Sequence, residues 1–195
     1  MGIINFHGNW RYTSNFKKMS KKNKIYLILI IFISFAAFFS LIIGLNKENT
    51  YYPNAKIKLL DKEIIVKDLF SNNKVNFENI IKSNNYTIIN IWSSWCAPCR
   101  SEHKFLMSLS DNIKINIVGL NYKDNENNAQ NFLNELGNPY DIVLVDKDGL
   151  ISIELGAYGV PETFIINNQE KLIVKKYIGP IDKQILDEIK KIVKQ

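Results

Sequence analysis

The longest hydrophobic stretch of the chain runs from residue 25 to residue 46 and contains no charged residue. As a helix it would span roughly 33 Å, which matches a hydrocarbon core of about 30 Å. Cleaved secretory signals have shorter apolar cores of about 7–15 residues and a small-x-small cleavage site, and no convincing site of that kind follows this run. We therefore predict an uncleaved transmembrane anchor at 25–46, with a cleaved signal and a buried soluble helix as the alternatives.

Beyond a polar linker at 47–56, the apolar segments alternate between strand-like and helix-like periodicity. Runs of β-branched and aromatic residues, such as YTIINIW at 86–92, predict buried strands. Apolar residues three and four apart predict helices, for which Asn76 is a candidate N-cap and Gly137 a candidate end. The expected strands are 62–66, 86–92, 113–120, 140–145, 161–166 and 171–178, and the expected helices are 75–83, 97–110, 125–137, 147–156 (helix or turn) and 181–195. This alternation indicates an α/β sheet, mixed because its last two strands form a hairpin.

The charge is distributed unevenly along the chain. Residues 1–24 hold six basic residues and no acid, so the rest of the chain has 19 basic residues against all 19 acids. A nucleic-acid footprint would need basic residues clustered in the folded part, and we therefore expect no nucleic-acid partner. By the positive-inside rule, 1–24 is cytoplasmic and the chain after the membrane segment lies outside. Residues 57–195 then form one domain of ordinary size.

The chain has two cysteines, Cys96 and Cys99, separated by two residues in the stretch WSSWCAPCR. Haem attachment uses C-x-x-C-H, but residue 100 is arginine. A zinc site would combine both thiolates with His103 and a carboxylate such as Glu102, which is an uncommon ligand set. A purely structural disulfide would close a very small loop and add little stability. Thiol–disulfide exchange is favoured, and we predict no metal and no cofactor.

The position of the pair between a buried strand and a helix assigns a role to each cysteine. Pro98 fits the first helical turn, where its missing N–H costs nothing. Cys96 then lies at the helix N-terminus, where unpaired N–H groups and the positive end of the helix dipole stabilise a thiolate. We predict that Cys96 is the exposed nucleophile and that Cys99, one turn into the helix, is the more buried resolving thiol.

The sequence WCAPC, after a strand and at the start of a helix, resembles the active site of the thioredoxin superfamily. The stretch GVPETF at 159–164 resembles that superfamily's cis-proline element, with Val160–Pro161 as the cis bond. More specifically, the segments 119–140 (GLNYKDNENNAQNFLNELGNPY) and 155–169 (LGAYGVPETFIINNQ) are similar to the DsbE/CcmG family of cytochrome c maturation. The resemblance extends over most of residues 57–190.

This resemblance implies a thioredoxin-like mixed sheet flanked by helices, with an extra αβ insertion and an N-terminal transmembrane helix. It also implies a protein of the bacterial inner membrane, with a cytoplasmic N-terminus and a periplasmic catalytic domain. The resemblance further implies that the protein reduces the haem-binding cysteines of apocytochrome c, within a C-x-x-C-H segment, and is re-reduced by a membrane electron donor of the DsbD or CcdA type.

Residues around the cysteines are expected to bind substrate or move protons. Asn90 stands where thioredoxins have a buried aspartate, and because an amide cannot shuttle a proton, Glu162 becomes the candidate proton carrier, with a plain surface glutamate as the alternative. Trp95 is expected to pack beside the thiols and touch substrate. The backbone at Val160 and Pro161 is expected to hold a substrate peptide as an added strand.

Three further expectations concern residues near this site. Trp92 is expected in the core, and His103 on the helix surface because its neighbours are polar. Residues 122–124 follow a strand end, where α/β sheets place ligand-contacting loops, so they either border the site or form a plain turn.

Two other functions fit the same sequence. One is an anchored reductase or oxidase of other exported proteins, since a thioredoxin-like fold supports both directions of exchange. The other is a thioredoxin-fold binding module with an idle disulfide.

Overall fold

The computed structural model describes residues 21–45, 50–51, 55–56, 63–81, 85–112 and 115–194. The chain divides into two compact units, Met1–Glu48 and Asn49–Gln195. In the first unit, α1 (Lys21–Leu45) is a single helix that contains nearly the whole predicted anchor. By length and composition, its residues Lys21–Leu41 are able to cross a membrane.

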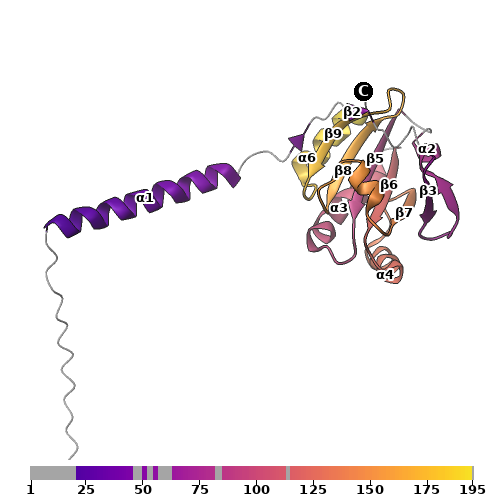
Figure 1. The fold of residues 1–195 in the computed structure, drawn as a ribbon. Coiled ribbons are helices and arrows are strands. Elements are labelled where there is room, and N and C mark those ends of the chain that lie inside the picture. The colour runs from indigo at the N-terminus through magenta and orange to yellow at the C-terminus, as the bar shows by residue number, and fades with distance from the viewer. Residues whose placement is uncertain are drawn as a thin grey trace, which may run out of the picture. The chain divides into compact units, whose positions relative to one another are not determined.

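The second unit is built around a mixed sheet with the strand order β1-β9-β8-β5-β6-β7-β3-β4 (Figure 1). Strands β5, β6 and β7 are parallel, whereas β8 and β9 form an antiparallel hairpin against β5, as the sequence predicts. The strands are β1 (Thr50–Tyr51), β2 (Ala55–Lys56), β3 (Ile65–Asp68), β4 (Lys74–Asn76), β5 (Tyr86–Trp92), β6 (Asn116–Tyr122), β7 (Ile142–Asp146), β8 (Glu162–Asn167) and β9 (Leu172–Ile178). The helices are α2 (Phe77–Ile80), α3 (Ala97–Asn112), α4 (Glu126–Leu136), α5 (Leu150–Glu154) and α6 (Lys183–Val193).

The N-terminal edge of this unit differs from the sequence prediction. Strands β1 and β2 lie within 47–56, the range predicted as a linker, and both pair antiparallel with β9. Their polar, tyrosine-rich sequence has too little apolar alternation to indicate strands. They form because the edge of β9 offers backbone hydrogen-bonding groups that need partners.

Both faces of the central strand β5 are buried, which explains its nearly continuous apolar sequence. Since side chains alternate along a strand, Ile88, Asn90 and Trp92 share one face of β5. Ile88 and Trp92 belong to the core cluster that includes apolar side chains of α3, α4 and α6. Ile89 and Ile91 belong to the cluster that includes α2 and α5. Asn90 is therefore a polar residue on the face that packs against α3.

Two predicted helix boundaries are confirmed. The side chain of Asn76 accepts a hydrogen bond from the Glu78 N–H at the start of α2. Gly137 ends α4 with φ of 91°, a backbone conformation that glycine adopts without a steric cost.

Candidate active site

The cysteine pair lies where β5 passes into α3, as the sequence predicts. Strand β5 ends at Trp92, residues 93–96 form a short connection that we call the redox loop, and α3 begins at Ala97. Cys96 and Cys99 form a disulfide with a Cα–Cα distance of 5.3 Å. The Arg100 N–H donates to the Cys96 carbonyl at 3.2 Å, so the helical hydrogen bonds begin at Cys96 and Pro98 falls within the first turn.

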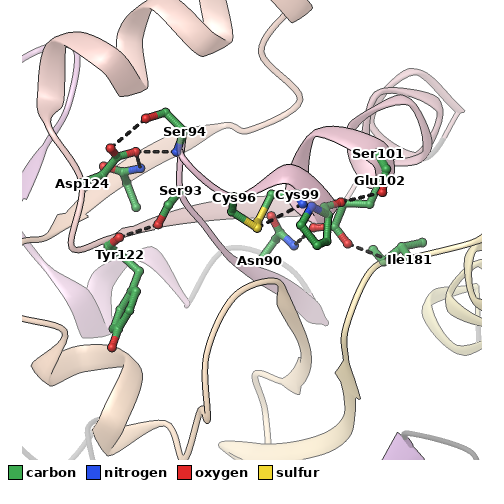
Figure 2. Close-up of a disulfide and its surroundings, with 12 residues drawn as sticks. Asn90, Ser93, Ser94, Cys96, Cys99, Ser101, Glu102, Tyr122, Asp124 and Ile181 are labelled. Carbon is green, nitrogen blue, oxygen red and sulfur yellow. Dashed lines mark hydrogen bonds between the residues drawn. A yellow bond between two sulfur atoms is a disulfide. The ribbon is translucent and has the colours of Figure 1, made fainter. Parts of the chain in front are cut away.

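The two sulfurs are not equivalent. The Cys99 N–H donates to the Cys96 Sγ at 3.1 Å, so a backbone donor at the helix N-terminus points at the sulfur of the first cysteine (Figure 2). Such a donor stabilises the sulfur as an anion. The expectation that Cys96 is exposed is wrong for this oxidised state, because Cys96 and Cys99 are only 4% and 2% exposed and both pack in the core cluster around α3.

A cis-proline from a segment distant in the sequence directly precedes β8, the strand that pairs with β5. The Val160–Pro161 peptide bond is cis, as the resemblance implies. Strand β8 begins at the next residue, and Ile91 near the end of β5 lies opposite Glu162 in the sheet. Val160 is half-buried and packs against the core cluster that contains both cysteines.

Glu162 is not the surface glutamate of the alternative expectation, since it is 1% exposed. Its Oε1 accepts the N–H groups of Tyr158 at 2.7 Å and of Gly159 at 3.0 Å. Its Oε2 lies 2.9 Å from Nζ of Lys176, an equally buried lysine that also donates to the Gly156 carbonyl at 2.7 Å. These contacts tie down the segment that precedes the cis-proline, so the geometry gives Glu162 a holding role.

A different carboxylate, Glu102, lies beneath the cysteines. It is on α3 three residues after Cys99, and residues at this spacing share a helix face. Glu102 is 1% exposed, and burial raises the pKa of its carboxyl group to about 7, against the opposing effect of hydrogen bonds from the Ile181 N–H at 2.7 Å and Asn90 Nδ2 at 2.9 Å. A carboxyl group with that pKa can both accept and release a proton near neutral pH.

Asn90 is the centre of this buried polar network. Its Nδ2 donates to Glu102 and to Thr163 Oγ1 at 3.1 Å, and its Oδ1 accepts the Tyr140 hydroxyl at 2.8 Å. Burial, followed by the nearby Glu102, raises the pKa of Tyr140 well above its usual value, so this hydroxyl remains a donor. The Asn90 amide thus orients Glu102, and the carboxyl group of Glu102 is the group of this pair that can ionise.

The sequence interpretation names Glu102 only as a possible zinc ligand and does not predict a buried carboxylate at this position, although one signal for it is available. An amide at position 90 leaves the site without the usual acid, and Glu102 is the carboxylate that follows Cys99 by one helical turn. Its burial depends on α6 and on Ile181, which packs over α3 from the far end of the chain.

On the other side of Cys96, the redox loop is bonded to residues 122–124, which confirms that this segment borders the site. The indole Nε1–H of Trp95 donates to the Lys123 carbonyl at 3.2 Å while its side chain stays 59% exposed. Trp92, by contrast, is a core residue as predicted, 1% exposed and packed on Phe132 and Tyr140 at centroid distances of 5.1 and 5.7 Å.

His103 is not the surface residue that its polar neighbours predict. It is 4% exposed, its Nε2 lies 3.0 Å from the Gly137 carbonyl, and its ring meets Phe132 edge-on. Burial is the main cause that lowers its pKa, which favours neutral imidazole. Within the described ranges, no group of three or more His, Cys, Asp and Glu side chains is arranged to hold a metal ion. The exposed Arg100 pairs with Glu135 on α4 at 2.8 Å.

A cysteine pair at the N-terminus of the helix after a central strand, with a cis-proline directly before the strand that pairs with it, defines a thioredoxin-like thiol–disulfide oxidoreductase that works through Cys96 and Cys99. The family model described as Redoxin matches residues 53–192. This chain belongs to the redoxin family and, within it, to the DsbE-type thiol:disulfide interchange proteins.

Individual relatives agree with this membership. Thiol:disulfide interchange protein DsbE of Escherichia coli (strain K12) is 34% identical over 171 residues, which cover 86% of this chain and 91% of the relative. Thiol:disulfide interchange protein CycY of Rhizobium leguminosarum bv. viciae is 43% identical over 94 residues, which cover 48% of this chain and 50% of the relative. Among solved structures, a secreted thiol-disulfide isomerase from Corynebacterium glutamicum has the same fold, with a TM-score of 0.62 at 20% identity, covering 77% of this chain and 95% of the other.

Proposed function

We propose that this protein is a reductase anchored in the bacterial inner membrane that reduces the haem-binding cysteines of apocytochrome c in the periplasm. The observation that carries the redox role is the Cys99 N–H directed at the Cys96 sulfur. The anchor is supported by the apolar helix α1 and by the six basic residues, with no acid among them, in residues 1–24. The substrate class is supported by membership among DsbE-type proteins and by the relative named CycY.

In the proposed reaction the reduced protein donates two electrons to its substrate. The Cys96 thiolate attacks one sulfur of a substrate disulfide, and the other substrate sulfur leaves as a thiolate that takes up a proton. Cys99 then attacks Cys96 in the mixed disulfide and releases the second substrate thiol. The protein ends with the Cys96–Cys99 disulfide, which a dithiol donor of the DsbD or CcdA type must reduce again.

The second attack requires the Cys99 thiol to lose its proton in a buried place. Glu102 shares a helix face with Cys99, and at a pH near 7 about half of its carboxyl groups are ionised. We assign Glu102 as the base that accepts this proton and Asn90, through its hydrogen bond, as the residue that orients it. Glu162 instead keeps Val160 and Pro161 in position for the backbone of a substrate peptide.

Trapping the mixed disulfide tests the substrate and the roles of the cysteines together. Full-length Cys99→Ala protein, expressed in cells that make c-type cytochromes, should retain apocytochrome c through a bond to Cys96 that dithiothreitol releases. Cys96→Ala is the matched control and should retain none. If only unrelated exported proteins were captured, the result would favour the alternative function, an anchored reductase or oxidase of other exported proteins. If the chain with both cysteines changed to alanine still restored cytochrome maturation in a deletion strain, the binding-module reading would replace the redox one.

A further inference from the structure

A second carboxylate, Asp124, lies on the side of Cys96 opposite to Glu102. Figure 2 shows Asp124, Ser94 and Tyr122 on one side of the Cys96 sulfur, with Glu102 and Ile181 on the other. The cysteine chemistry described above uses none of the first three residues. What they contact is the redox loop itself.

Asp124 binds the redox loop through both of its oxygens. Its Oδ2 accepts the backbone N–H of Ser94 and the Asn121 Nδ2 at 3.0 Å, and its Oδ1 accepts the Ser94 hydroxyl and the Asn125 N–H, both at 2.8 Å. Four donors therefore converge on one carboxylate, and two of them belong to a residue two positions before Cys96. Hydrogen bonds with a charged partner are stronger than those between neutral groups.

The neighbouring residues add two more bonds between the same loops. The Ser93 hydroxyl donates to the Tyr122 carbonyl, and the Trp95 indole donates to the Lys123 carbonyl. Lys123 has a φ of 45°, in the left-handed region that non-glycine residues rarely occupy. Such a conformation persists only where the surrounding contacts fix it. Residues 93, 94 and 95 are each bonded to the segment 122–124, so the loop before Cys96 is fixed along its length.

Trp95 is the residue for which this arrangement matters most. An indole ring with 59% exposure has little packing to restrain it, yet it stands next to the nucleophile. It is held by one bond to a carbonyl and by a backbone that Asp124 fixes through Ser94. An aromatic ring held in one orientation offers a large contact surface at a low cost in conformational entropy.

We propose that Asp124 is a positioning residue for substrate docking: through Ser94 it holds the Trp95 ring and the backbone before Cys96 in the orientation that an incoming disulfide peptide requires. This inference rests on the proposed function, because it concerns the docking step of the same reaction. The two carboxylates then have different roles on opposite sides of Cys96. Glu102 accepts the proton of the resolving thiol inside the fold, and Asp124 positions the loop that an incoming substrate contacts. The N–H from Cys99 that stabilises Cys96 belongs to α3 and does not depend on Asp124.

The test compares docking with thiol chemistry in full-length protein purified in detergent. Asp124→Ala should raise the KM for an oxidised C-x-x-C-H peptide about tenfold or more, the order expected when bonds to a charged group are lost, with a much smaller change in kcat. The pH midpoint for alkylation of Cys96 by iodoacetamide should be unchanged. Asp124→Asn keeps one acceptor oxygen but loses the charge, so its KM should lie between those of the unmodified protein and Asp124→Ala. Asp111→Ala, which removes an exposed carboxylate at the far end of α3, should have no effect.

Two results would overturn the inference. One is an unchanged KM in Asp124→Ala, with only a lower melting temperature, which would make the contact structural. The other is a shift of the alkylation midpoint that accounts for the rate change, which would make Asp124 an electrostatic modulator of the thiolate. If Asp124→Ala fails to fold, Ser94→Ala takes its place, because it removes the hydroxyl bond alone. It should raise the KM by a smaller factor, and the same two results would overturn the inference.

A second peptide keeps this result separate from the proposed function. Every variant is also assayed with an oxidised C-x-x-C peptide in which alanine replaces the histidine. Equal turnover of both peptides by the unmodified protein contradicts the apocytochrome assignment. A higher KM for both peptides in Asp124→Ala still supports the positioning role.

Discussion

Replacing Glu102 by glutamine should remove the contribution of this carboxyl group to the pH dependence of the free energy of unfolding. Burial raises the pKa of this carboxyl group from 4.5 to about 7 in the folded protein. The folded state therefore holds the proton more tightly than the unfolded state, and stability falls as the pH rises from about 4.5 to about 7. At 1.36 kcal/mol per pKa unit, the loss from this one group is about 3 kcal/mol, and it is complete above pH 8.

Glutamine resembles the protonated form and does not titrate. Relative to the unmodified protein, Glu102→Gln should gain up to about 3 kcal/mol between pH 4.5 and pH 8. A pH-independent loss is superimposed on this change, because Asn90 Nδ2 loses an acceptor if the glutamine turns its own NH₂ group toward it. Only the slope of the difference between the two proteins measures the titration of Glu102, since every other ionisable group contributes equally to both.

The assay is urea unfolding of both oxidised full-length proteins at half-unit steps from pH 4.5 to pH 8. Parallel stability curves would refute the reasoning, because they would mean that Glu102 has an ordinary pKa in the folded state. A kinetic experiment then tests its use as a base: release of substrate from the mixed disulfide should slow by roughly a hundredfold in Glu102→Gln, the lower range for general base catalysis. Glu162→Gln is the matched control, and an equal slowing in it would return the proton-carrier role to Glu162.

Two further predictions concern the packing that supports the site. Gly119→Ala should lower the free energy of unfolding by about 2 kcal/mol, because a Cβ at this position would lie 2.7 Å from the Tyr140 ring; an unchanged melting temperature would show that the ring moves aside freely. Lys176→Met should cost about 3 kcal/mol, because it leaves the buried Glu162 carboxylate without its cation. Adding Glu162→Gln to Lys176→Met should restore part of that loss in urea unfolding, and two fully additive losses would contradict the pairing.

The features that the sequence predicts well are those that depend on neighbouring residues. The helix boundaries at Asn76 and Gly137 follow from local capping chemistry. The strand before Cys96 follows from a run of apolar residues, and the helix after it from the periodicity of its apolar positions. The cis-proline came from family resemblance, since few X–Pro bonds are cis by composition alone.

The features that the sequence predicts poorly depend on which distant segments of the chain pack over a residue. His103 and Glu102 have polar neighbours in the sequence, yet both are buried. His103 contacts Gly137 and Phe132, and Glu102 accepts a hydrogen bond from Ile181. Glu162 belongs to the predicted strand 161–166, but that prediction does not indicate that Lys176 on the neighbouring strand lies against its carboxylate.

By itself, the sequence determined that an apolar helix of membrane-spanning length precedes an α/β domain and that its two thiols meet at a helix start, because length, spacing and periodicity are local properties of a chain. Only the tertiary structure shows that Glu102 is buried against Asn90 and Ile181 and that Asp124 accepts hydrogen bonds from Ser94. The reason is physical: burial raises the pKa of the Glu102 carboxyl group to about 7, and the sequence around Glu102 does not show that Ile181, far along the chain, helps to remove water from it.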